Sequence, residues 1–190
     1  MSKTMAVVVA GWRSSVTAMA KPACAALLLA VPAFAAAEVK SSSPAGFEVE
    51  SKATVAAAPA EVYARLGRVG DWWSSAHTYS GKAANMSLEL KAGGCFCEVM
   101  PQGGGTIEHG RVIFAMPGAT LRLQGGLGPL QQEAAVGTLT WSLKAVPGGT
   151  EVTQSYVVGG YVRGGADKFA AIVDQVLAEQ LAGLRKSFAK

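Results

Sequence analysis

The stretch from Gly165 to Lys190 constrains the fold of this 190-residue chain more than any other part. Its apolar residues recur every three or four positions, which is the period of one face of an α-helix. At about 1.5 Å per residue this helix would be about 35 Å long. Such a broad apolar face must pack on a large apolar surface. The face consists of Phe169, Ile172, Val173, Val176, Leu177, Leu181, Leu184 and Phe188.

Segments typical of β-strands precede this helix. Residues 46–55 alternate apolar and polar side chains, and short helices are predicted over 58–67 and 71–75. Short turns rich in Gly and Pro separate the later strands, which favours antiparallel pairing. We therefore predict an α+β fold in which a curved antiparallel sheet of about seven strands, with two short helices, packs against a long C-terminal helix. The later strands are expected over 86–90, 95–100, 106–116, 119–124, 137–145 and 150–158.

The first 37 residues have the pattern of a secretory signal. A basic beginning leads to an apolar run at 23–31 and to small residues at 33–37. This run is shorter than the roughly 20 residues of a membrane-spanning helix, so we expect cleavage and no stable membrane anchor. The expected location is periplasmic or secreted. Residues 38–46 are interpreted as a polar tether and 47–190 as one folded domain.

Charge argues against nucleic acid as a partner. The formal charge is +4, but residues 38–190 hold 14 Lys and Arg against 13 Asp and Glu, so the excess arises from the leader. No basic patch is visible in the remaining sequence. No glycine-rich phosphate loop and no Gly-x-Ser-x-Gly motif occurs, and we expect no cofactor.

Four short motifs appear in an order that resembles the START-like helix-grip superfamily, also called SRPBCC. They are Ala57-Ala58-Pro59-Ala60-Glu61-Val62-Tyr63, Trp72-Trp73, Gly93-Gly94-Cys95-Phe96-Cys97-Glu98 and Gly149-Thr150-Glu151-Val152-Thr153. The resemblance covers about residues 47–188, and the superfamily includes the polyketide cyclase/dehydrase-like proteins. It implies an apolar cavity between the sheet and the last helix, where members bind lipids, sterols, polyketides or hormones. It implies no shared catalytic residues.

Three functions are compatible with this resemblance. We favour a secreted binding protein for a small hydrophobic ligand, without catalysis. The alternatives are a cyclase or dehydratase acting on a polyketide-like substrate, and a chaperone-like module that binds a partner protein. An enzyme would need an acid–base pair that converges in the cavity. The sequence leaves the oligomeric state open.

Polar residues on otherwise apolar faces are the candidate ligand contacts. Gln180 lies at the centre of the apolar helix face, and Gln154 and Tyr156 share a strand face with Val152 and Val158. A buried amide without partners costs about 1–3 kcal/mol, so Gln180 either orients a ligand or bonds Tyr156 in the core. His77 could act as a general base or be a surface histidine, and the tryptophan pair could be core or ligand contact. The predicted ligand-binding set is Trp72, Trp73, His77, Tyr79, Glu98, Trp141, Gln154, Tyr156, Val173, Leu177 and Gln180.

Cys95 and Cys97 form the most conspicuous chemical pair in the sequence. Residues two apart on a strand point to the same face. Idle thiols, a disulfide and a metal site completed by His109 are all open, although extended Cα atoms two residues apart lie near the limit of disulfide geometry. The hairpin register also leaves open whether Cys97 faces Glu108 or His109.

Overall fold

The computed structural model describes Met1 and residues 36–189. Nearly all of the expected signal segment, 1–37, therefore lies outside the described residues, as does Lys190. Within the described part, no helix is both long and apolar enough to cross a membrane.

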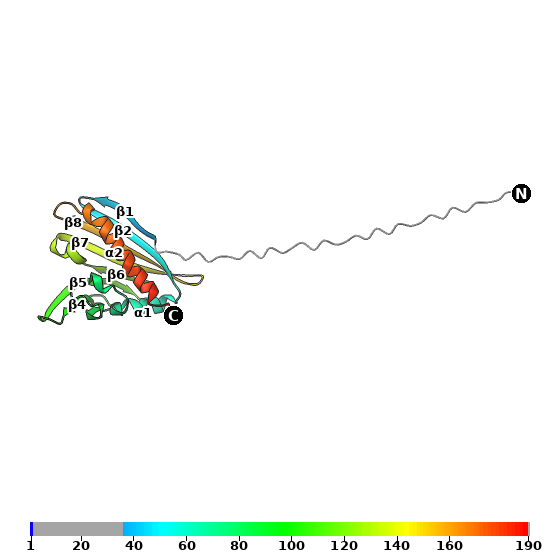
Figure 1. Cartoon of the computed structure of the whole chain (residues 1–190), viewed down its shortest axis with the longest axis horizontal. Coiled ribbons are helices and arrows are strands. Elements are labelled where there is room, and N and C mark those ends of the chain that lie inside the picture. Colours follow the sequence, from blue (N-terminus) through cyan, green and yellow to red (C-terminus); the bar gives the residue numbers. More distant parts are fainter. Residues whose placement is uncertain (2–35, 190) are drawn as a thin grey trace. The chain divides into compact units, whose positions relative to one another are not determined.

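One open antiparallel sheet of eight strands forms the framework of residues 36–189. Its order is β1-β2-β8-β7-β6-β5-β4-β3, so β1 is an edge strand and β2 pairs with the last strand, β8, rather than with β3 (Figure 1). The predicted later strands and their turns are confirmed to within a few residues. The bounds are β1 Ala36–Ser43, β2 Gly46–Val55, β3 Met86–Leu88, β4 Cys95–Met100, β5 Gly105–Met116, β6 Thr120–Gln124, β7 Ala134–Val146 and β8 Gly149–Tyr161.

Strand β1 corrects the expectation of a polar tether over 38–46. It pairs with β2 from Ala36 opposite Lys52 to Ser43 opposite Gly46. Its described side chains, from Glu38 onward, are exposed, and its register shifts between Val39 and Ser41. An edge strand is held by backbone hydrogen bonds and needs no apolar face, so alternation in the sequence could not reveal it. Charged and polar side chains are also typical of protected edges.

A short helix, α1 Pro59–Leu66, follows β2 as predicted. Glu61 accepts a hydrogen bond from the amide of Ala58 at 2.9 Å, which satisfies one of the free donors at the helix start. The predicted second helix is instead a series of single 3₁₀ turns. These are η1 Val69–Asp71, η2 Ser75–His77 and η3 Ala83–Asn85, and a fourth, η4 Gly128–Gln132, lies in the long loop before β7.

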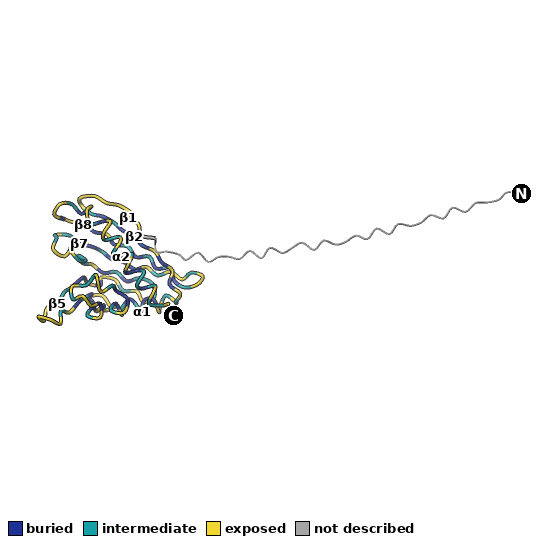
Figure 2. Tube along the Cα trace, viewed as in Figure 1, coloured by how far each residue is buried: buried dark blue, intermediate teal, exposed yellow. Residues whose placement is uncertain are grey.

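The long helix α2, Asp167–Lys186, confirms the prediction from the apolar period. It lies across the sheet beside β1 and β2, and α1 lies near its C-terminal end (Figure 1). The sheet face toward α2 is apolar, so the core lies between them, and buried and exposed positions alternate along the strands (Figure 2). The largest fully buried side chains are Trp141, Tyr156, Phe96, Leu66, Leu121, Leu123, Leu130, Leu139, Leu181, Leu184, Gln154 and Gln180.

Candidate functional site

A cleft of about 450 Å³ opens beside the N-terminal half of α2. Its walls come from four parts of the chain, namely α2, the segment that contains η2, the loop that contains η4, and His109 on β5. Most of the side chains are apolar, and the polar ones include two imidazoles and a phenol. The lining residues are Trp73, Ala76, His77, Thr78, Tyr79, His109, Leu127, Gly128, Pro129, Gln132, Phe169, Ile172, Val173, Val176 and Leu177.

Partly buried hydrogen bonds, to Gln180 of α2 and within the segment itself, fix the wall formed by the η2 segment. The side-chain oxygen of Gln180 accepts from the amide of Ser74 at 2.8 Å, and its nitrogen donates to the carbonyl of Val176 at 3.1 Å. The indole of Trp73, the residue before Ser74, donates to the carbonyl of His77 at 3.1 Å. The segment therefore has a defined conformation although its elements are single 3₁₀ turns.

Tyr156 fixes the opposite wall. Its hydroxyl donates to the carbonyl of Gly125 at 2.8 Å and accepts from the amide of Leu127 at 3.1 Å. A Cβ atom at Gly137 would overlap the Tyr156 ring, so glycine is required there. Burial raises the pKa of Tyr156 to about 12, against a smaller opposing effect of the Leu127 amide, so the hydroxyl keeps its proton. The two walls also meet directly, because Tyr79 donates to the carbonyl of Gly128 at 3.1 Å.

A β-bulge in β5 brings His109 to the cleft. Cys97 pairs with Glu108 and Phe96 with Gly110, which leaves His109 as the extra residue between them. As a result His109 and Gly110 are both buried, whereas regular alternation would expose one of them. The register left open by the sequence is thus settled with Glu108 opposite Cys97.

Two glycines allow the sheet to close around this bulge. A Cβ atom at Gly110 would lie 2.8 Å from the carbonyl oxygen of Gln124. One at Gly125 would overlap the carbonyl oxygen of His109. Both positions therefore need the close backbone approach that only glycine permits.

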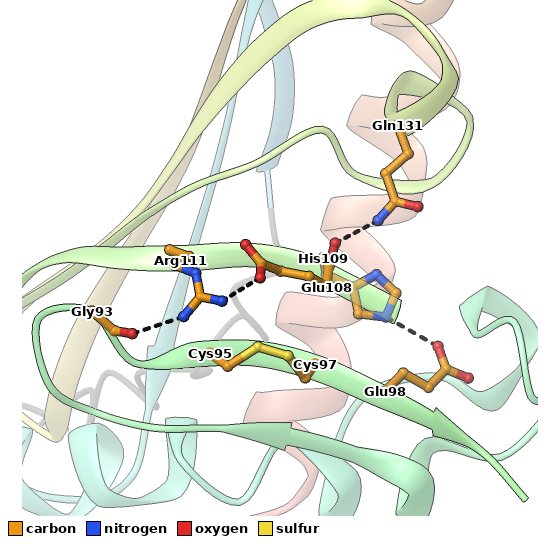
Figure 3. The surroundings of a disulfide bond; sticks show 8 residues. All are labelled: Gly93, Cys95, Cys97, Glu98, Glu108, His109, Arg111 and Gln131. Carbon is orange, nitrogen blue, oxygen red and sulfur yellow. Dashed lines mark hydrogen bonds and ion pairs between the residues drawn. A yellow bond between two sulfur atoms is a disulfide. The ribbon is translucent and has the colours of Figure 1, made fainter. Parts of the chain in front are cut away.

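Glu98 is completely buried next to His109. Nε2 of His109 lies 3.0 Å from Oε2 of Glu98 (Figure 3). The amides of Tyr79 and Ser80 also donate to this carboxylate. Burial raises the pKa of Glu98, but the hydrogen bonds from Ser80, Tyr79 and His109 outweigh it and leave the pKa below the usual value of 4.5. Burial lowers the pKa of His109 from 6.5, against the opposing effect of Glu98. The pair is therefore an ionised carboxylate and a neutral imidazole near pH 7.

A second imidazole, His77, lies at the cleft in a more exposed setting. Its Nε2 atom is 3.0 Å from Oε2 of Glu179 on α2, and the two side chains are 31% and 50% exposed. Hydrogen bonds from Ser74 and His77 lower the pKa of Glu179. Surface pairs of this kind add little stability, so the contact mainly orients His77.

Five members of the predicted ligand-binding set border the cleft: Trp73, His77, Tyr79, Val173 and Leu177. Their contact with a ligand stays a prediction. The other six do not border it, and they are Trp72, Glu98, Trp141, Gln154, Tyr156 and Gln180.

The residues expected to form the polar lining make hydrogen bonds to other parts of the protein, and their contact with a ligand stays a prediction. Gln154 accepts from the Trp141 indole at 2.8 Å and donates to the carbonyl of Leu177 at 2.8 Å. Gln180 bonds Ser74 and Val176, as described above, and does not bond Tyr156. The periodicity of apolar residues predicts which side chains point inward, but it does not predict which partners those side chains contact.

The cysteines form a disulfide rather than a metal site. Cys95 and Cys97 are bonded, with Cα atoms 5.4 Å apart, which is closer than in a fully extended strand. Their neighbours Phe96 and Glu98 point to the buried face with His109, so the cysteines face the opposite side (Figure 3). No group of three metal-ligating side chains occurs among the described residues.

Sequence reasoning missed two parts of the site. The sequence offers His109 only as a candidate metal ligand, because nothing in it marks a bulge. The η4 wall, Leu127–Gln132, lies between the predicted strands 119–124 and 137–145, where no element is expected. The remaining helical lining residues, Phe169, Ile172 and Val176, were visible in the apolar period of α2.

No protein-family model and no curated protein matches this chain. Solved structures do share its fold. Protein MLL2253 from Mesorhizobium loti is 14% identical with a TM-score of 0.54, over 74% of this chain and 95% of that one. CalU16 from Micromonospora echinospora is 13% identical with a TM-score of 0.54, over 82% of this chain and 85% of that one.

The di-domain ARO/CYC protein StfQ from the steffimycin biosynthetic pathway is a further match. It is 13% identical with a TM-score of 0.51, over 76% of this chain and 51% of StfQ, so the chain spans about half of that protein. At such identities the likeness concerns the fold alone. With the open antiparallel sheet and the long C-terminal helix, it shows that residues 36–189 have an α+β helix-grip fold.

Proposed function

We propose that this chain is a START-like helix-grip protein that binds a small, mostly apolar molecule in the cleft beside α2. The cleft is the observation that carries the proposal. Its volume of about 450 Å³ lies within the range of small-molecule sites, and a few polar groups interrupt an apolar lining. Both loop walls are held by partly buried hydrogen bonds to Gln180 and Tyr156, so the site is formed before a ligand arrives.

The distribution of polar groups suggests how a ligand lies. The apolar stripe of α2, with Phe169, Ile172 and Val176, would contact its hydrocarbon body. His77, Tyr79 and His109 would contact its polar end. We therefore expect an elongated or ring-shaped molecule with a polar group at one end.

Binding can be measured with the neutral fluorescent probe N-phenyl-1-naphthylamine. The wild type should bind it saturably, and Val176→Trp should weaken binding at least about tenfold by filling the cleft. Val136→Trp is the matched control, because Val136 lies on β7, is 52% exposed and does not line the cleft. Equal weakening in both variants, or none in Val176→Trp, would refute binding in this cleft. Native mass spectrometry of protein from its own host would then identify a co-purified ligand.

A cyclase-type enzyme is the second candidate. The fold is shared with StfQ, an ARO/CYC protein, but at 13% identity this supports the possibility of catalysis only through the fold. One observation within this chain favours it, namely a buried imidazole at the cleft paired with an ionised carboxylate.

We also propose that the protein is exported to the periplasm or secreted, on the basis of the leader pattern over 1–37. The mature chain should begin near Ala36 or Glu38, at the start of β1. Intact mass of the exported protein measures this directly, and a full-length mass there would disprove cleavage.

A further inference from the structure

His109 is accessible from the cleft and otherwise enclosed. Its side chain is 6% exposed, yet it is one of the residues that line the cleft. Nε2 is hydrogen-bonded to Glu98, whereas Nδ1 has no hydrogen-bond partner among the described residues. The two ring nitrogens are separated by one carbon, so Nδ1 lies on the side of the ring away from Glu98 (Figure 3).

Several contacts hold this imidazole in one orientation. The Phe96 ring lies 5.0 Å from its centroid and the Tyr79 ring 5.9 Å from it, at interplanar angles of 39° and 34°. Glu98 is itself fixed by the amides of Tyr79 and Ser80. The bulge in β5 sets the direction of the side chain from the backbone. Such fixed geometry is a requirement for a group that transfers protons.

The hydrogen-bond pattern also fixes the tautomer. An ionised carboxylate can only accept hydrogen bonds, so Nε2 of the neutral imidazole must carry the proton. Nδ1 then holds the free lone pair. A neutral imidazole with its free nitrogen available to an apolar cleft is a base, and the carboxylate behind it stabilises the imidazolium that would form.

We propose that His109 is the general base of an acid–base site in this cleft and that Glu98 is its positioning residue. The substrate class is an apolar molecule with an acidic C–H bond, such as one next to a carbonyl group. Nδ1 takes the proton, the C–H electron pair forms the enolate, and the imidazolium returns the proton to another atom of the same molecule. The net reaction is an isomerisation that needs no further reactant. This proposal rests on ligand binding in the cleft.

The groups around His109 determine how such a site responds to pH. Glu98 on β4 and the phenol of Tyr79 face it directly, and His77, paired with Glu179 on α2, lines the same cleft. Burial lowers the pKa of His109 by more than Glu98 raises it. The rate should therefore rise with pH through a midpoint below the usual histidine pKa of 6.5, where His109 becomes neutral and can accept a proton.

The probe for this site is 5-nitrobenzisoxazole, an apolar carbon acid. Transfer of its C3 proton to Nδ1 forms a nitrile as the ring N–O bond breaks, and it releases a coloured cyanonitrophenolate. The full chain should accelerate this elimination saturably. His109→Gln should reduce the acceleration at least about 100-fold, a typical contribution of a general base. Glu108→Gln is the matched control and should change it less than about threefold, because Glu108 precedes His109 on β5 but has a 46% exposed side chain that does not line the cleft.

Glu98→Gln distinguishes positioning from simple packing. It removes the group that raises the pKa of His109, so the maximal rate should fall and the midpoint of the pH–rate profile should move downward. The unmutated protein provides a test that does not depend on how a variant folds. A profile without a midpoint at or below pH 6.5 overturns the proposal, as does equal activity in His109→Gln and wild type. Naphthylamine binding without elimination overturns this inference alone, whereas absence of both overturns the binding function as well.

Discussion

Nε2 of His109 lies 3.0 Å from Oε2 of Glu98, and neither side chain is more than 6% exposed. The two residues come from neighbouring strands, and the bulge in β5 turns the imidazole toward the carboxylate. A neutral imidazole and an ionised carboxylate are thus stabilised together inside the domain. This arrangement has consequences for stability as well as for chemistry.

Acid should destabilise the protein through this pair. The folded-state pKa of His109 lies below its unfolded value of 6.5, so its contribution is complete above pH 6.5 and is lost as the pH falls through the folded pKa. The pKa of Glu98 is also lowered by folding, so its contribution to stability is complete above pH 4.5 and is lost as the pH falls through the folded-state pKa. Urea unfolding at several pH values should show a smaller acid-induced loss in His109→Gln than in wild type. An equal loss would mean that other groups dominate.

The tautomer of His109 should be visible by NMR. The chain contains two histidines, so their imidazole signals can be assigned with His77→Gln alone. We expect His109 to carry its proton on Nε2 and to titrate below pH 6.5. Nitrogen chemical shifts across a pH series measure both properties. A proton on Nδ1 would contradict the role assigned to Glu98.

Gln180→Leu should destabilise the fold by about 1–3 kcal/mol, because it leaves the amide of Ser74 without its partner. Binding of the naphthylamine probe should persist, since Gln180 does not line the cleft. Gln175→Leu, on an exposed face of the same helix, is the control and should change stability by less than about 0.5 kcal/mol. Urea unfolding decides this, and unchanged stability in Gln180→Leu would argue against the hydrogen bond.

Loss of the disulfide should have a modest effect. Cys95 and Cys97 close a loop of very few residues, so the chain-entropy contribution is about 1–2 kcal/mol. Cys95→Ser with Cys97→Ser should melt like the wild type under reducing conditions and slightly below the oxidised wild type. Thiol titration of the unreduced mature protein should find neither cysteine free. Two reactive thiols would show that the bond does not form.

Much of the fold follows from local patterns in the sequence. The apolar period over Phe169–Phe188 predicts α2, because a helix returns to the same face every 3.6 residues. Alternation over 46–55 predicts β2 with Phe47 and Val49 buried. The turn at Pro147-Gly148 predicts the β7–β8 hairpin, where Gly148 has a φ of +89°. Each of these features depends on residues near one another in the chain.

The site depended on contacts between distant residues. A one-residue bulge decides whether His109 faces the cleft, and bulges have no reliable mark in a sequence. Gln180 accepts from Ser74 and Gln154 donates to the carbonyl of Leu177, both more than 20 residues away in the chain. The position of each glutamine on its element could not predict these partners. Strand β1 pairs with β2 through its backbone and lacks an apolar pattern. Periodicity fixes which way a side chain points, whereas register and long-range packing decide what it meets.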